Sequence, residues 1–167
     1  MLGTGAVAVT GALAGCGGNG NGNGGGNGNG NGNGDGSDGG NGGGSASPEE
    51  QATSYLNENE ANGFEGDVSD QTGQSEVTVE VGAGPNGFQF APTAITVDTG
   101  TTVTWEWTGE GGQHNVVSNG GDYGDLESER IAEEGHTYTY TFEEAGAALY
   151  VCEPHRAQGK YGAVVVQ

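Results

Sequence analysis

The stretch TTVTWEW, residues 101–107, alternates polar and apolar side chains with a strict period of two. Val103, Trp105 and Trp107 fall on one face, while threonine and glutamate residues fall on the other. Because successive side chains of a β-strand point to opposite sides of the sheet, this pattern predicts a half-buried strand. The tryptophan pair allows a ligand-stacking surface, but aromatic residues at this spacing are more typical of core packing.

Six further segments of the second half carry strand signals, either the same alternation or short runs rich in β-branched residues. They are EVTVEV (76–81), AITV (94–97), HNVV (114–117), HTYTYTF (136–142), ALYVC (148–152) and GAVVV (162–166). Clusters of Gly, Asn, Asp and Pro separate them, as is typical of turns between strands. Roughly seven or eight short strands in about 90 residues predict an all-β fold, an antiparallel Greek-key β-sandwich.

The sequence before this domain, which we place at 76–167, divides into three segments. Residues 1–16 form an apolar, small-residue run ending in Leu-Ala-Gly-Cys, which is too short to span a bilayer as a helix and is typical of a signal peptide. Residues 17–47, rich in Gly and Asn, have little apolar surface to bury and predict a disordered tether. Residues 48–75 predict a short helix followed by a connector.

The chain is strongly acidic, with 23 Asp and Glu residues against 3 Lys and Arg residues and a formal net charge of -20. Such a surface repels phosphate backbones, so we expect no nucleic-acid partner. Salt screens repulsion between surface charges, and this composition therefore favours a halophilic source.

The two cysteines lie in different contexts. Cys16 closes the N-terminal apolar run and Cys152 ends a strand-like segment. A disulfide between them is the simplest use of two cysteines in an exported protein, but these positions favour two separate roles.

The segment CEPH, residues 152–155, places a cysteine at a strand end and a histidine on the turn beyond it. His114 follows a Gly-rich turn and is expected at the same end of the sandwich. Two imidazoles and one thiolate form a trigonal donor set, which suits copper in an electron-transfer site. Zinc would require four firm ligands, and a Cys–His nucleophile pair would require an orienting partner. His136 begins a distant strand, and we expect it not to bind metal.

Three stretches resemble the halocyanins, membrane-tethered archaeal relatives of plastocyanin in the cupredoxin family. They are WEWTGEGGQHNVVS (105–118), TFEEAGAALYVCEPH (141–155) and GAVVV (162–166). The resemblance spans about 55–167, and the LAGC ending resembles a lipobox, in which Cys16 would carry the lipid anchor.

This resemblance implies a one-electron carrier with one type 1 copper ion bound by His114, Cys152 and His155 as equatorial ligands. Asn115 is either a residue that ties the two ligand loops together by hydrogen bonds or an ordinary surface strand residue. One closed site for a single metal ion leaves no place for a substrate, so we do not expect an enzyme.

The family has a methionine as a weak axial ligand five residues after the second histidine, where this chain has Lys160. Three outcomes are open. Lys160 swings out to solvent and leaves three ligands, with or without a backbone carbonyl such as that of Gln113; it binds as a neutral amine; or Gln158 reaches the metal. We favour the first outcome and expect copper to bind, because the axial bond is weak.

The expected function is electron transfer on the outer face of the cell membrane, by a lipid-anchored monomer that exchanges electrons with redox partners of a membrane electron-transport chain. Arg156 and Lys160 form a local basic spot, which either docks an acidic partner or consists of two ordinary loop charges. The alternatives are a copper storage or delivery protein and, less favoured, a metal-free structural domain.

Overall fold

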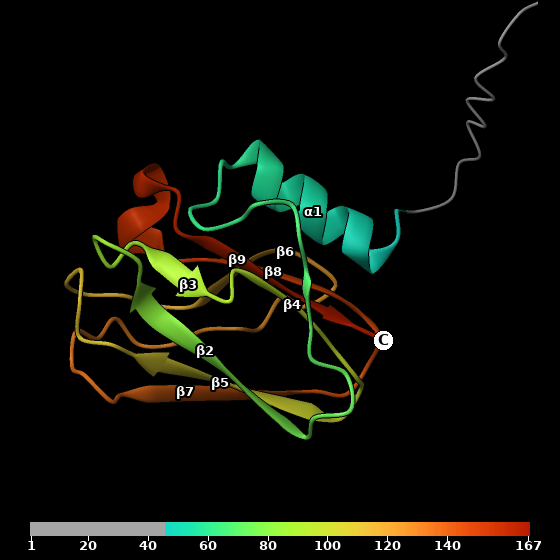
Figure 1. Cartoon of the computed structure of the whole chain (residues 1–167). Helices are drawn as coiled ribbons and strands as arrows, with labels where there is room; N and C mark the ends of the chain where they lie inside the picture. The colour runs from blue at the N-terminus through green and yellow to red at the C-terminus, as the bar shows by residue number, and fades with distance from the viewer. Residues whose placement is uncertain (1–45) are drawn as a thin grey trace, which may run out of the picture. The chain divides into compact units, whose positions relative to one another are not determined.

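The computed structural model describes residues 46–167, so the signal segment at 1–16 and almost all of the tether at 17–47 lie outside the described residues. The described chain forms two β-sheets that pack face to face, with helix α1 (Pro48–Glu58) along the outer face of one of them (Figure 1). The all-β sandwich expected from the sequence is confirmed.

Nine strands are present within residues 46–167. One sheet has the spatial order β1-β4-β9-β8-β6 and the other the order β3-β2-β5-β7. The 3-10 helix η1 (Glu153–Gln158) joins β8 to β9. The strand bounds are β1 Ser69–Asp70, β2 Glu76–Ala83, β3 Gln89–Ala91, β4 Ala94–Val97, β5 Thr101–Trp107, β6 Val117–Gly121, β7 Thr137–Phe142, β8 Gly146–Val151 and β9 Tyr161–Val166.

Both sheets are mixed, so the expected antiparallel arrangement holds for only part of the strand pairs. Strands β1 and β4, β4 and β9, and β2 and β5 pair in parallel, whereas the other neighbouring strands pair antiparallel. Hydrophobic alternation indicates that one face of a strand is buried. It does not indicate whether the neighbouring strand runs parallel or antiparallel. The strands of each parallel pair are not consecutive in the chain. The chain between them passes through the other sheet before it returns.

The segment at 114–117 is not the strand that its sequence indicated. His114 forms an isolated bridge with Ile131, and β6 begins only at Val117. The amide of Val116 donates to the Ser128 hydroxyl at 2.8 Å, and its carbonyl accepts from the Ser128 amide at 3.0 Å. The backbone of 114–116 is therefore held by the loop that precedes β7 and not by a sheet.

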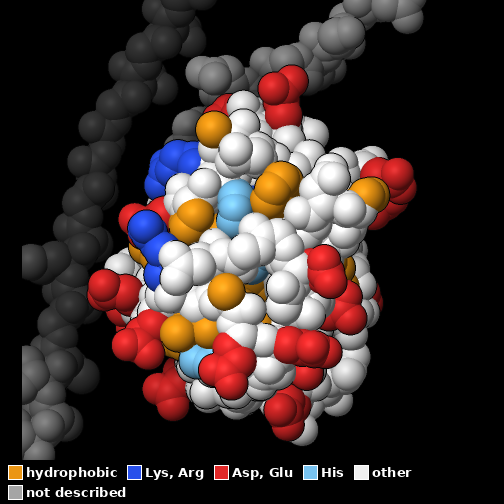
Figure 2. All heavy atoms as spheres, turned by 90° about the vertical axis from the view of Figure 1, so that its left-hand side faces the viewer, with side chains coloured by type: hydrophobic (Ala, Val, Ile, Leu, Met, Phe, Trp, Pro, Cys, Tyr) orange, Lys and Arg blue, Asp and Glu red, His pale blue; other side chains and the backbone are white. Residues whose placement is uncertain are grey.

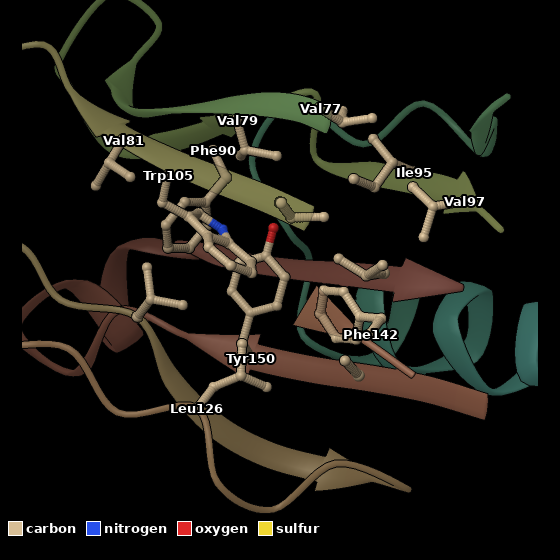
Figure 3. Packing of buried hydrophobic residues seen from close by; sticks show 14 of the residues in the cluster. Val77, Val79, Val81, Phe90, Ile95, Val97, Trp105, Leu126, Phe142 and Tyr150 are labelled. Atoms are coloured by element: carbon tan, nitrogen blue, oxygen red, sulfur yellow. The ribbon is translucent and has the colours of Figure 1, made fainter. Parts of the chain in front are cut away.

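The main hydrophobic core lies between the two sheets. Trp105 and Trp107 are buried in it, which confirms that the tryptophan pair serves core packing. Trp105 meets the ring of Tyr150 edge-on, with centroids 5.4 Å apart (Figure 3). A layer of large aromatic rings therefore ties β5 to β8 across the sandwich, which holds the two sheets together close to where β8 ends.

A second cluster lies between helix α1 and the outer faces of β8 and β9. Every residue of these two strands is buried, because the core covers one face and the helix covers the other. This explains why their sequences are almost continuously apolar. Within residues 46–167, none of the helices has the length and apolar character needed to cross a membrane.

Helix α1 begins at Pro48 because the residue before it is an effective cap. The Ser47 hydroxyl accepts a hydrogen bond from the Glu50 amide, and the Glu50 carboxylate accepts one from the Ser47 amide. This capping box and the proline at the first helical position fix the start of the helix. Buried Tyr55 then attaches it to the sheet, since its hydroxyl donates to the Tyr150 carbonyl at 3.0 Å.

Candidate metal centre

Three side chains converge at the end of the sandwich where β8 stops. The Nδ1 atoms of His114 and His155 are 3.0 Å apart, and the Cys152 Sγ atom lies 3.6 Å from the first and 3.5 Å from the second. A point in the plane of these atoms lies about 2.0 Å from all three, which is a typical metal–nitrogen bond length in proteins. Two imidazole nitrogens and one thiolate sulfur suit copper, so the residues present fit a single copper ion.

The backbone brings Cys152 and His155 together through a closed loop. Cys152 follows the last residue of β8, and its amide donates to the Lys160 carbonyl at 3.0 Å, across the base of the loop. The His155 amide donates back to the Cys152 carbonyl at 3.0 Å, and Pro154 restricts the turn between them. The C-x-x-H spacing is therefore what one tight turn requires to place both side chains on the same side.

His114 is oriented by a hydrogen bond on the far side of its ring. Its Nε2 atom lies 2.7 Å from the carbonyl oxygen of Glu110. A carbonyl only accepts, so Nε2 carries the proton and the Nδ1 lone pair faces Cys152 and His155. Metal-binding histidines are commonly fixed in this way, which supports a ligand role for Nδ1.

Asn115 connects the two ligand-bearing segments. Its Nδ2 donates to the Glu153 carboxylate at 2.9 Å, and its Oδ1 accepts from the Glu153 amide at 2.9 Å. Arg130 pairs with the same carboxylate at 3.0 Å. Asn115 is buried and links the two loops by hydrogen bonds, so it is not an ordinary surface strand residue.

Burial sets the protonation of the two histidines. Removal from water lowers the pKa of His114 to about 4, assisted by the nearby Lys160 side chain. The pKa of His155 is also lowered, mainly by burial. Burial raises the pKa of the Cys152 thiol. Both imidazoles are thus neutral and available as donors near neutral pH, whereas the thiol would release its proton to a bound metal.

The expectation that Lys160 swings out to solvent was wrong. Lys160 is 0% exposed, its Nζ atom lies 2.8 Å from His114 Nδ1, and it donates to the Gly87 carbonyl at 3.1 Å. The ammonium group also lies 5.0 Å from the centre of the Phe90 ring. Backbone hydrogen bonds with Cys152 and His155 fix the backbone of Lys160 just before β9 begins. In this backbone orientation the Lys160 side chain points into the protein. Burial lowers its pKa to about 7.

The other predicted axial candidates are placed differently. Gln158 is exposed, and its carbonyl accepts a hydrogen bond from Asn62. The carbonyls that bond to side chains of the centre are those of Gly87 and Glu110, whereas the sequence pointed to Gln113. A backbone carbonyl leaves no signature in the sequence, so these two were missed. His136 lies apart from the three ligand candidates, packed edge-on against Trp107, as expected.

The centre approaches the surface through His155. Its ring is only half-buried and lies against the Phe88 ring, with centroids 4.6 Å apart. Figure 2 shows this end of the molecule, where a histidine lies at the surface among hydrophobic side chains and the acidic side chains lie farther out. The face over the centre is therefore less acidic than the chain as a whole.

Comparisons with known proteins agree with this geometry. Residues 77–167 match the family model of copper binding proteins of the plastocyanin/azurin family. The chain is 56% identical over 167 residues to a halocyanin of Natronomonas pharaonis, covering 100% of this chain and 94% of the relative. It is 33% identical over 99 residues to a plastocyanin of Scenedesmus fuscus, covering 55% of this chain and 100% of the relative.

Among solved structures, the Cu(I) form of an amicyanin variant aligns with 29% identity and a TM-score of 0.47, covering 56% of this chain and 83% of that chain. The resemblance drawn from the sequence is thus confirmed by the family match and by the full-length relative. This chain belongs to the plastocyanin/azurin family of copper-binding proteins.

Proposed function

We propose that this protein is a one-electron carrier with a mononuclear type 1 copper centre, bound by Cys152 Sγ and by the Nδ1 atoms of His114 and His155. The observation that carries the proposal is the convergence of these three donor atoms around one point at metal-bonding distance. Copper held there supplies a reversible Cu(I)/Cu(II) couple, for which mixed sulfur and nitrogen donors are suited.

The protein's contribution is to keep the donors in place while the charge of the centre changes. Cys152 is fixed by the end of β8, His114 by the Glu110 carbonyl, and the two ligand segments by Asn115 and Glu153. Donors on packed strands and hydrogen-bonded loops have little freedom to move. Electron exchange therefore requires little rearrangement of this chain.

His155 is the route by which electrons enter and leave. Its half-buried ring connects the buried thiolate side of the centre with the surface, and Phe88 covers part of it. Arg156, next in the chain, is exposed, and we propose that it favours acidic partner surfaces at this end. Arg130 adds little positive charge here, because it is paired with Glu153.

Lys160 is proposed to lie beside the three donors without supplying the sulfur that a methionine would. The absence of this further electron donor, together with a basic group beside His114, would disfavour the more highly charged Cu(II) relative to Cu(I). We therefore propose that the lysine raises the reduction potential while the three other donors retain the metal.

We further propose that the domain is a monomer anchored to the outer face of the cell membrane through a lipid on Cys16, and that residues 17–47 form its tether. The support is the order of an apolar segment, a cysteine and a Gly/Asn-rich stretch. Its partners would be redox proteins of a membrane electron-transport chain. The mass of the mature N-terminal peptide tests the anchor: it should carry lipid on Cys16, and Cys16→Ala should abolish both the lipid and membrane association.

Addition of Cu(II) to the metal-free protein tests the copper centre. We expect one equivalent to bind and to produce an intense visible thiolate-to-copper charge-transfer band. Copper storage or delivery is a second candidate, since the axial position is altered. Colour without rapid electron exchange would favour storage, and the absence of colour would contradict the type 1 centre.

A further inference from the structure

The segment after helix α1 contacts the loop of residues 152–160, called the metal loop below, although the segment lies outside the residues matched by the family model. We propose that Asn62 in this segment is a positioning residue that fixes His155 for copper. The inference deepens the proposed function and rests on it for the role of His155. The hydrogen bonds of Asn62 are formed in the metal-free protein, so their effect can be measured without copper.

Asn62 forms hydrogen bonds to two successive carbonyls at the end of η1. Its amide donates to the Gly159 carbonyl at 2.8 Å, and its Nδ2 atom donates to the Gln158 carbonyl. The last carbonyls of a helical turn have no partner within the turn, so they need donors from elsewhere. Asn62 thus caps the end of the short helix that carries His155.

The same side chain also reaches the loop on the other side of His155. Its Nδ2 atom donates to the Phe88 carbonyl at 3.3 Å, and the Phe88 ring packs on the His155 ring. The two Nδ2 protons of one asparagine therefore bridge the Phe88 loop and the metal loop. His155 belongs to one of these loops and lies against the other.

The backbone of the two segments is shaped for this contact. Gly159 has a φ of 75°, and a Cβ atom on it would lie 2.9 Å from the Glu60 carbonyl oxygen. Glu60 itself has a φ of 48°, a left-handed conformation that is unfavourable for a residue with a side chain. The backbone at Gly159 and at Glu60 thus adopts the conformation that lets the metal loop and the segment after α1 approach closely, which indicates that the contact is specific.

Other ligands do not depend on Asn62. His114 is held by the Glu110 carbonyl and the bridge to Ile131, and Cys152 by the backbone of Lys160. Loss of the Asn62 side chain should therefore loosen the His155 side of the centre and leave the other side in place. This selectivity separates a positioning role from a general effect on stability.

The test compares the full-length wild type with Asn62→Ala and with Asn62→Leu, which has a similar volume but no donors. Asn119→Ala is the matched control, because the Asn119 side chain donates a hydrogen bond to the Tyr55 hydroxyl of α1 and not to the metal loop. In the metal-free protein, we expect the amides of Gly159 and Lys160 to exchange hydrogen about tenfold faster in both Asn62 variants, since each hydrogen bond lost contributes modestly. The control should match the wild type.

With copper, we expect both Asn62 variants to bind about tenfold more weakly than the wild type, as is typical when a bond that orients a ligand is removed. Unchanged exchange in the loop, wild-type behaviour of Asn62→Leu, an equal effect of Asn119→Ala, or unchanged copper binding would each overturn the proposal. Failure of the wild type to bind copper would refute the proposed function instead, and it would leave the exchange result as a separate measurement of the loop contact.

Discussion

The two sides of the metal centre are built differently. On one side, His114 and Cys152 are 0% exposed. Cys152 follows the end of β8, whereas His114 is held by backbone hydrogen bonds with Ile131 and by the Glu110 carbonyl. On the other, His155 is half-buried at a kink within the 3-10 helix η1, and its ring lies against Phe88. The buried side is suited to retaining copper, and the exposed side to contact with a partner.

Retention of a metal ion and access of a partner to it would therefore depend on different parts of the chain. A ligand inside the sandwich is protected from water and exchange, but it offers no surface to a partner. A ligand on an exposed loop offers that surface but needs support, which here comes from Asn62, Phe88 and Asn115.

Replacement of the buried sulfur should have the largest effect. Cys152→Ser removes the soft donor while preserving size and burial. We expect complete loss of the visible charge-transfer band and a fall in copper affinity of more than roughly 100-fold, since even a bond that merely supports a ligand is worth up to that amount. Competition with a chelator measures the affinity. Retention of the band would show that another group gives rise to the charge-transfer transition and would refute the assignment of Cys152 as the sulfur ligand.

Removal of each histidine should give unequal results on the two sides. His155→Gly leaves a gap near the surface, so added imidazole should enter and restore the visible band. His114→Gly leaves a gap inside the protein, and we expect no restoration at the same imidazole concentration. The band is followed during an imidazole titration of both copper-loaded variants. Equal restoration of the two would contradict the division into a buried and an exposed side.

A methionine in place of Lys160 should alter the potential and not the existence of the centre. We expect Lys160→Met to bind copper and to have a lower reduction potential, because an added electron donor and the loss of the basic group beside His114 both favour the more highly charged Cu(II). A shift of about 59 mV corresponds to a tenfold change in the relative affinity for the two oxidation states. Voltammetry of the wild type and the variant measures the shift, and a rise or no change would count against this account of Lys160.

The smallest effect is expected where helix α1 attaches to the outer face of the sheet, at a residue that makes no hydrogen bond to the three donor side chains. Tyr55→Phe removes the bond to the Tyr150 carbonyl and the acceptor of Asn119. We expect the free energy of unfolding to fall by about 1–2 kcal/mol, because buried polar groups lose a partner. Denaturant unfolding checks this, and the copper band should stay unchanged. A shifted band would mean that helix α1 affects the centre through Tyr55, in addition to the effect of Asn62 in the segment that follows the helix.

Local patterns in the sequence predicted most of the sandwich and the three donor residues. Hydrophobic alternation identified β2, β5 and β7. The spacing within CEPH was enough to predict that Cys152 and His155 lie close together. The errors concern long-range pairing. The direction of Lys160 depends on its backbone bonds to Cys152 and His155, and the mixed sheets depend on which strands become neighbours.

Asn62 illustrates the same limit. It stands in a polar connector and resembles many surface asparagines, while its partners Phe88, Gln158 and Gly159 lie far along the chain. Its contacts arise only once the sandwich has formed. Carbonyl groups such as those of Gly87 and Glu110 are invisible to sequence patterns, because every residue has one.

A reductive titration of the copper-loaded protein measures whether this centre carries single electrons. We predict that one electron per chain bleaches the visible band, that reoxidation restores it fully over repeated cycles, and that electron exchange with a small redox reagent is rapid. A centre that binds copper but cannot be cycled, or that releases copper on reduction, would contradict the account.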